Sequence, residues 1–421
     1  MRELPIDGQL PQILAQLQSH NCLIVEAPPG TGKTTRAAPA LLPLANANWD
    51  LVDSARANPT LTKPALANSG NFPQGKVLLI QPRRIAARAA AARIAADLQT
   101  PLGQLVGYQV RFDARVSAAS RLIAMTPGIL LRRLQSDGVL ADVAAVVLDE
   151  FHERSLEVDL LLGMLRRLQQ ELRPELRLML MSATLDSRLV KSYLNHPPVV
   201  SVAAYTFPVH KHFSRFQPTA TRGRTPPSPG RRIVEQCVTT TRQAASDHTG
   251  DILVFLPGVG EIHQAARELQ FDADREGWQL LKLYGDLSSE EQDRVLAPAR
   301  QRKVILSTNV AETSLTIENV RIVIDSGWAR VQRFDPAVGL NMLVLEPIPN
   351  ASAEQRAGRA GRTDSGVCYR TRGATSRFDW SSFTVALLGR SKCSRISLAD
   401  APIGSGTTAS SADVAQAGCC R

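Results

Sequence analysis

Short apolar segments alternate with longer polar or alanine-rich stretches along most of the chain. The apolar segments of the first half are Leu23–Glu26, Val77–Gln81, Arg121–Met125, Ala145–Leu148 and Leu178–Ser182. Nearly continuous apolar runs of this length are typical of parallel strands that are buried on both faces. The stretch Ile85–Leu98 is rich in alanine and arginine, which are good helix formers, and predicts a helix. Residues 1–205 therefore predict an α/β domain with a doubly wound parallel sheet.

Two stretches without apolar periodicity interrupt this alternation. Asn46–Gly75 mixes Asn, Pro, Ser and Gly and predicts an exposed insertion, whereas Gln217–Arg232 predicts a connector. The alternation then resumes, with strands expected at Asp251–Leu256, Leu280–Leu283, Lys303–Ser307 and Arg321–Asp325. Residues 206–372 therefore predict a second sheet of the same kind.

The first apolar segment leads into a glycine-rich stretch that reads Ala-Pro-Pro-Gly-Thr-Gly-Lys-Thr-Thr from Ala27. Its glycines let backbone N–H groups face inward, Lys33 can reach the β- and γ-phosphates, and the Thr34 hydroxyl can ligate Mg²⁺. Ala27 replaces the first glycine of the strict pattern, which it can do if its φ stays negative. A generic turn before a helix is the alternative. The predicted phosphate-binding residues are Pro29, Gly30, Thr31, Gly32, Lys33, Thr34 and Thr35.

A pair of carboxylates follows the apolar segment Ala145–Leu148. Asp149 and Glu150 would emerge at the carboxyl edge of a parallel sheet, where such sheets place their chemistry. Asp149 can hold Mg²⁺, directly or through water, and Glu150 can orient an attacking water. Paired acids at this place can also be only the N-terminal charges of a helix. The phosphate loop in the same domain favours a nucleotide triphosphatase, with the nucleotide in the cleft between the two sheets.

Seven motifs fall in the order and spacing of the superfamily 2 helicases, and together they resemble the DEAH/RHA branch. They are Gly30–Thr34, Gln81–Arg84, Thr126–Gly128, Asp149–His152, Ser182–Thr184, Ser307–Ile317 and Gln355–Arg362. The run Asp-Glu-Phe-His-Glu-Arg-Ser from Asp149 resembles the bacterial HrpB-like helicases in particular. The resemblance covers roughly residues 8–370 and implies two tandem RecA-like domains that use ATP and Mg²⁺ to move on a single strand.

The resemblance also implies a role for individual residues. Gln355 would orient the lytic water, and Arg359 and Arg362, at helical spacing from it, would serve as arginine fingers from one side of a helix. His152 would link the acidic motif to the second domain. The coupling residues would be Ser182, Thr184, Glu312 and Thr313, of which the last two are expected to begin a helix. The nucleic-acid-binding residues would be Arg83, Arg84, Thr126, Pro127, Gly128, Thr308 and Asn309.

Each of these motifs has a plainer alternative. Serines and threonines at strand ends are favoured helix caps, and arginines often form solvated faces. Base stacking between Arg93 and an aromatic residue of the second domain is also implied, but Leu296 stands at the matching position. Because leucine has no π-face, loose base selectivity is expected.

The end of the second domain contains a predicted β-hairpin and the point where the resemblance stops. Residues 328–348 form two extended arms around Asp335–Gly339, with Arg330 and Arg333 as a basic edge suited to strand separation.

After Arg370 the resemblance ends, and residues 373–421 are rich in Ser, Thr, Gly and Ala. They predict a disordered extension or an aberrant reading frame, hence an apparently truncated helicase with weak processivity.

Composition adds limits on location and partners. The net charge of +10 favours a polyanionic partner. The resemblance to the DEAH/RHA helicases implies single-stranded RNA before DNA. No run approaches the roughly 20 apolar residues of a membrane span. The protein is therefore expected to be cytoplasmic and to have no membrane partner. The six cysteines lack metal-site spacing and are expected to be reduced. The alternatives are a DNA translocase and a nucleic-acid-binding protein with a decayed motor, the latter disfavoured because the catalytic residues are intact. The sequence identifies no protein partner.

Overall fold

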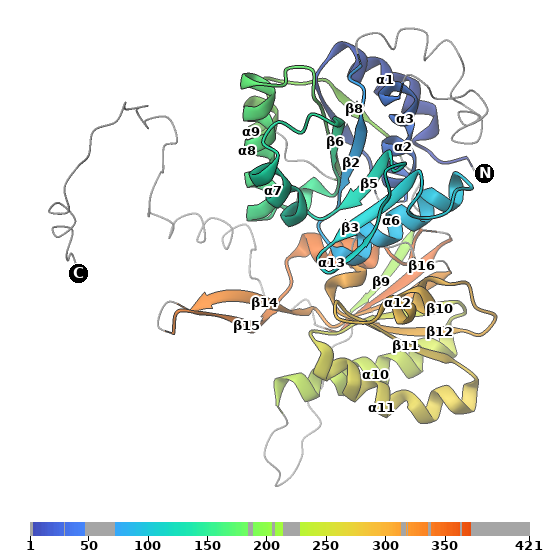
Figure 1. Cartoon of the computed structure of the whole chain (residues 1–421). Coiled ribbons are helices and arrows are strands. Elements are labelled where there is room, and N and C mark those ends of the chain that lie inside the picture. Colours follow the sequence, from blue (N-terminus) through green and yellow to red (C-terminus); the bar gives the residue numbers. More distant parts are fainter. Residues whose placement is uncertain are drawn as a thin grey trace, which may run out of the picture. The chain divides into compact units, whose positions relative to one another are not determined.

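The computed structural model describes residues 3–28, 30–46, 72–183, 188–203, 207–213, 228–312, 317, 319–335, 338–362 and 364–371 (Figure 1). These residues belong to one compact unit, Met1–Ala374. Most of the predicted insertion and all of the predicted tail lie outside the described residues. Cys22, Cys237 and Cys368 are buried free thiols. None of the helices in the described ranges has the length and hydropathy needed to span a bilayer.

The first sheet has the strand order β4-β3-β5-β2-β6-β7-β1-β8. Its strands are β1 (Cys22–Glu26), β2 (Lys76–Ile80), β3 (Val106–Val110), β4 (Asp113–Arg115), β5 (Leu122–Met125), β6 (Val143–Leu148), β7 (Arg177–Ser182) and β8 (Val199–Ser201). All neighbours pair in parallel except β3 and β4, so the α/β prediction is confirmed with one antiparallel edge strand added. The strands β3, β4 and β8 were not predicted, because they are short or interrupted by polar residues and glycine.

Both faces of this sheet are covered by helices, as a doubly wound fold requires. Alternate residues of β2 show it: Val77 and Leu79 join one buried cluster, whereas Leu78 and Ile80 join the other. The helices are η1 (Asp7–Gln9), α1 (Leu10–Ser19), η2 (Lys33–Ala37), α2 (Ala38–Ala40), α3 (Leu42–Ala45), α6 (Arg84–Asp97), α7 (Pro127–Ser136), η4 (Phe151–Glu153), α8 (Leu156–Glu171) and α9 (Arg188–Tyr193). The sheet therefore has no free face, and its chemistry is confined to the edges where strands end.

The second sheet is entirely parallel, with the order β11-β12-β10-β13-β16-β9. Its strands are β9 (Val209–Phe213), β10 (Asp251–Phe255), β11 (Gln279–Leu283), β12 (Lys303–Ser307), β13 (Val320–Asp325) and β16 (Gly366–Arg370). Its helices are α10 (Pro229–Asp247), α11 (Val259–Glu276), α12 (Ser289–Leu296), η5 (Asn309–Ala311) and α13 (Asn350–Ala357). The predicted connector is wrong at its end, because Pro229 starts α10 at a position where proline is well tolerated.

The hairpin is confirmed as two antiparallel strands, β14 (Trp328–Asp335) and β15 (Leu340–Pro347), which project from the second sheet in Figure 1. The expected basic edge is wrong, because both arginines are neutralised by neighbours. The Arg330 guanidinium lies 2.8 Å from Glu261, and that of Arg333 lies 2.9 Å from Glu346. The exposed surface of the hairpin is instead apolar, and Leu343 is 65% exposed.

Candidate active site

The phosphate loop connects β1 to η2 and is held by its own backbone. Gly30 and Gly32 have φ values of +88° and +89°, which side chains rarely adopt, and nothing lies within 4 Å of the point where a Cβ of Gly30 would stand. The Thr31 hydroxyl donates to the Pro28 carbonyl at 2.8 Å. Ala27 has no positive φ, so alanine fits there as expected. Of the predicted loop residues, Pro29 lies outside the described residues.

Lys33 opens η2, a π-helical turn, and its ammonium is turned toward the acidic strand end. The side chain is only 4% exposed, and its Nζ lies 2.9 Å from Glu150 Oε2. A buried ammonium requires a negative partner. In this structure Glu150 is that partner, at the place where a phosphate held by the loop would compete for the same ammonium.

Asp149 stands at the end of β6 and receives three hydrogen bonds. The Thr34 hydroxyl and Gln81 Nε2 (2.7 Å) both donate to Oδ2, while the Glu150 N–H donates to Oδ1 at 2.8 Å. Burial and the neighbouring Glu150 carboxylate nevertheless raise the pKa of Asp149 to about 6. A hydroxyl and a carboxylate at adjacent positions are the hard oxygen donors that Mg²⁺ prefers, and a cation would relieve the repulsion between the two acids. Thr34 and Asp149 therefore fit the predicted metal site.

Glu150 combines backbone strain with an ionised side chain. Its φ is +50°, a left-handed conformation that costs about 1–3 kcal/mol for a residue other than glycine and clusters at functional sites. Burial acts to raise the pKa of Glu150, but the Lys33 ammonium outweighs this and holds it below its ordinary value. The carboxylate is therefore available as a hydrogen-bond acceptor for water at neutral pH.

His152 lies in η4, directly after the two acids. Its Nδ1 accepts a hydrogen bond from the Ala183 N–H at 3.3 Å and lies 3.6 Å from Glu150 Oε2. Burial lowers the pKa of His152, so the ring is neutral and its Nδ1 can accept. The contact joins the acidic motif to the loop after β7, within the first sheet, and not to the second sheet as expected. Ser182 is buried at the end of β7, and Thr184 lies outside the described residues.

The arginines of the last motif leave the helix that was expected to carry them. Helix α13 ends at Ala357, so Gln355 is helical but Arg359 and Arg362 lie in the following turns. The chain turns here because Gly361 packs against the Phe207 carbonyl, where a Cβ would approach to 2.6 Å. A side chain at position 361 would therefore clash with the backbone of Phe207, so this position requires glycine.

Both arginines lie within the electrostatic field of Glu150. Burial and the adjacent Arg362 lower the pKa of Arg359, and Glu150 acts in the opposite direction. Burial lowers the pKa of Arg362 to about 10, again opposed by Glu150. Arg359 is held by a 3.0 Å hydrogen bond from its Nε to the Glu312 carbonyl. The Glu150 carboxylate therefore opposes the effect of burial on both guanidinium groups.

Two residues of the site, Gln81 and Arg356, lie within the motifs found in the sequence, but the sequence interpretation gave neither of them a role. Gln81 directly follows β2, and its position at a strand end was the available signal. Arg356 is 1% exposed, and it donates to Glu312 Oε2 at 3.0 Å and Asp325 Oδ1 at 2.8 Å. Glu312 was expected to begin a helix, but it follows the short η5 turn and anchors this cluster instead. Thr313 lies outside the described residues.

Replacing Arg356 with methionine should destabilise the protein by about 3–5 kcal/mol, because two buried carboxylates would lose their cation. Urea unfolding of the variant measures this. Arg333→Met is the matched control, because its ion pair with Glu346 is partly exposed and should contribute at most about 1 kcal/mol. Equal unfolding midpoints for the two variants would show that the buried ion pairs of Arg356 stabilise the protein no more than the partly exposed pair of Arg333.

The residues expected to contact nucleic acid stand at strand ends of both sheets. Arg83 donates to the Asn309 carbonyl and lies 3.2 Å from Glu153, and Arg84 lies 3.4 Å from Asp286. Thr126 and Thr308 occupy the N-cap positions of α7 and η5, but neither hydroxyl caps its helix, which removes the capping alternative. The remaining members, Pro127 (buried), Gly128 and Asn309 (both exposed), start or border these helices.

The expected base-stacking pair is placed on separate elements. Arg93 lies on the exposed face of α6, 3.2 Å from Asp97, and Leu296 packs against the buried cluster of the second sheet. The proposed sandwich of the base therefore stays a prediction.

Comparison with known proteins places these features in a family. Residues 9–192 match the DEAD/DEAH box helicase domain, and residues 232–364 match the helicase conserved C-terminal domain. The chain is 39% identical over 372 residues to the ATP-dependent RNA helicase HrpB of Escherichia coli, covering 87% of this chain and 41% of that protein. It is 34% identical over 371 residues to the ATP-dependent RNA helicase HrpA of Borreliella burgdorferi, with the same coverage of 87% and 41%.

A solved structure agrees with the sequence relatives. The crystal structure of the Escherichia coli DEAH/RHA helicase HrpB superposes with a TM-score of 0.73 at 37% identity, covering 88% of this chain and 43% of that one. The chain thus spans about two fifths of the length of the relatives it matches.

Proposed function

Because the chain belongs to the DEAH/RHA-type helicases, we propose that it hydrolyses ATP between its two RecA-like domains and uses the energy to move on a single nucleic acid strand. One observation carries the proposal: Lys33 and Glu150 form a buried pair, Thr34 bonds to Asp149, and the arginines Arg359 and Arg362 lie in the field of Glu150. The lysine, the hydroxyl and the carboxylates come from the first domain and the arginines from the second, which supports a triphosphate site between the two.

In the proposed mechanism each residue acts on a different part of the reacting phosphate. The loop N–H groups and Lys33 bind the β- and γ-phosphates, which frees Glu150 from its ion pair to orient the attacking water. Arg359 and Arg362 stabilise the charge that develops on the transferred group, and Gln355 helps to position the water. Thr34 and Asp149 would hold a Mg²⁺ ion, which would supply positive charge to neutralise the phosphates. His152 transmits the state of the acidic motif to the loop after β7.

The affinity for Mg²⁺ should fall as the pH drops through about 6. Asp149 must be ionised to act as a ligand, and its raised pKa means that protons compete with the metal below that pH. The apparent Mg²⁺ requirement of ATP hydrolysis should rise roughly tenfold per pH unit below this point. Metal titrations at pH 5, 6 and 7.5, at a constant concentration of the Mg-ATP complex, measure it. A requirement that does not change with pH would exclude Asp149 as the ligand.

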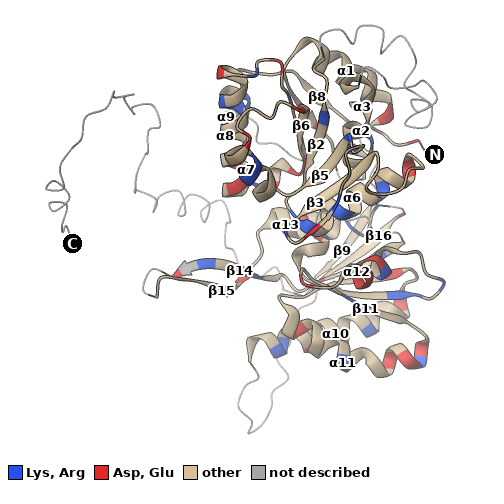
Figure 2. Ribbon diagram, viewed as in Figure 1, with Lys and Arg blue, Asp and Glu red and all other residues tan. Residues whose placement is uncertain are grey.

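We propose RNA as the strand on which the motor moves, because the relatives HrpB and HrpA are named RNA helicases. Arg83 and Arg84 supply positive charge at the start of α6, and the ribbon of this helix has further Lys or Arg positions, coloured blue in Figure 2. Arg83 would exchange its present contacts with Glu153 and the Asn309 carbonyl for backbone phosphates.

Stimulation of ATP hydrolysis by homopolymeric single-stranded RNA and DNA of equal length tests this assignment. RNA should stimulate more strongly, and Arg83→Gln should weaken RNA binding and reduce the salt dependence of binding by about one phosphate contact. Arg115→Gln, an exposed arginine of β4, is the control and should change neither. Equal or stronger stimulation by DNA would favour the DNA translocase instead.

A further inference from the structure

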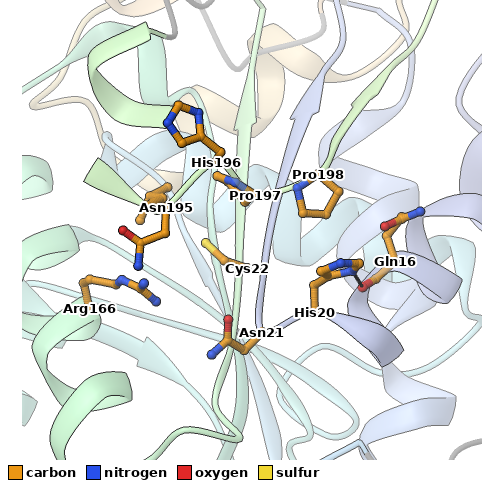
Figure 3. Close-up of a pocket in the computed structure, with 10 residues that line it drawn as sticks. Gln16, His20, Asn21, Cys22, Arg166, Asn195, His196, Pro197 and Pro198 are labelled. Atoms are coloured by element: carbon orange, nitrogen blue, oxygen red, sulfur yellow. Dashed lines mark hydrogen bonds between the residues drawn. The ribbon is translucent and has the colours of Figure 1, made fainter. Parts of the chain in front are cut away.

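A cavity of about 530 Å³ lies at the amino edge of the first sheet, away from the carboxyl edge that holds the candidate active site (Figure 3). It is lined by Gln16, His20, Asn21, Cys22, Arg166, Leu194, Asn195, His196, Pro197 and Pro198. Cys22 is the first residue of β1, whose last residue precedes the phosphate loop. The cavity is therefore separated from the loop by the length of the strand, roughly 16 Å. Its size is within the range of small-molecule sites, about 300–1,000 Å³.

The base of this cavity carries a buried positive charge. Arg166, on α8, is 8% exposed, and Figure 3 shows its guanidinium pointing toward Asn21 and Cys22. Its Nη1 donates to Gln169 Oε1 at 3.3 Å, whereas its Nε has no hydrogen-bond partner. Among the described residues no carboxylate lies within ion-pair distance of it, and none lines the cavity. A buried guanidinium without a counter-charge is costly, so its position implies an anionic ligand.

The rim of the cavity adds neutral and titratable donors. His20 Nδ1 bonds to the Gln16 carbonyl at 3.2 Å, which leaves its Nε2 for other partners. Asn195 and His196 both have left-handed backbone, with φ of +59° and +53°, and such strained residues cluster at ligand-binding sites. Burial raises the pKa of the Cys22 thiol to about 11, so Cys22 brings no negative charge into the cavity. Every ionisable group lining the cavity is thus cationic or neutral at pH 7.

We propose that this cavity binds a small phosphorylated molecule, with the Arg166 guanidinium holding the phosphate and the asparagine and histidine side chains of the rim completing its shell. The planar guanidinium matches two phosphate oxygens at once. A small molecule is favoured over a nucleic acid strand, because the cavity volume is within the small-molecule range and the charge is carried by a single buried arginine. The inference is independent of the ATPase mechanism, which uses none of these residues.

The test is calorimetric titration of the full chain with inorganic phosphate, at constant ionic strength and with the phosphate loop saturated by a non-hydrolysable ATP analogue. Arg166→Gln should weaken phosphate binding at least tenfold. Arg167→Gln is the matched control, because Arg167 is the next residue of α8, is 75% exposed and pairs with Glu171; it should bind like wild type. Equal affinity in all three proteins, or no binding to wild type, would overturn the proposal.

Two further arms keep the test decisive. Should Arg166→Gln fail to fold, a crystal of the wild-type chain soaked in tungstate should show an anomalous peak beside Arg166. A peak at the phosphate loop alone would contradict the site. Single-stranded RNA that displaces phosphate from the wild-type chain, whether or not it also displaces phosphate from Arg167→Gln, would assign the cavity to a polymer. That result would also overturn the small-molecule assignment.

Discussion

Replacing Glu150 with glutamine is expected to lower the rate of ATP hydrolysis about 10²–10⁴-fold while nucleotide binding is retained. The carboxylate orients water, and the amide keeps its shape but loses the charge that attracts the water proton. Because the variant removes the carboxylate that competes with phosphate for Lys33 in the free protein, it should bind ATP at least as tightly as the wild type does. Steady-state phosphate release and binding of a fluorescent ATP analogue measure the two effects.

Glu153→Gln is the matched control for this variant. Glu153 lies three residues from Glu150 and pairs with Arg83. Its replacement removes one negative charge from the same region, but it leaves the Lys33–Glu150 ion pair intact. It should retain most of the wild-type ATPase rate. Similar losses in both variants would show that the reduction comes from local charge and not from the position of Glu150.

Replacing Arg359 with alanine is expected to lower the ATPase rate about 10³-fold or more. Its Nε donates to the Glu312 carbonyl, and the Glu150 carboxylate acts on the guanidinium electrostatically. Its loss should reduce kcat with little change in the KM for ATP, because the interaction strengthens only as charge develops on the transferred phosphate.

Arg321→Ala controls for removal of an arginine from the second sheet. Arg321 pairs with Asp364 at a partly exposed position and has no contact with the candidate active site. Its variant should hydrolyse ATP at nearly the wild-type rate. A reduction of less than tenfold in Arg359→Ala would mean that Arg359 is not an arginine finger.

The parts of the site that consist of a few adjacent residues could be predicted from the sequence. The phosphate loop, the acids after β6 and the hairpin arms needed only strand ends and glycine positions. Contacts between distant segments could not be predicted in this way. Gln81 bonds to Asp149, and Arg356 bonds to Asp325, through pairings that depend on which strands become neighbours in the sheets.

The incorrect expectations share one physical cause: the local sequence pattern does not show which residue a side chain will contact in the folded protein. Arg330 and Arg333 look basic in the sequence but are neutralised by Glu261 and Glu346. The spacing of the last motif suggested a continuous helix, yet α13 ends at Ala357 because the chain must bring Gly361 against Phe207.

The central claim, that the described residues assemble a working ATP-hydrolysing motor, is tested most directly by phosphate release from the purified chain. The measurement compares wild type with Glu150→Gln, with Mg-ATP, in the presence and absence of single-stranded RNA. The account predicts a wild-type rate at least about 10²-fold above that of the variant, which rises further with RNA. Rates that are equal in the two proteins, with and without RNA, would contradict it.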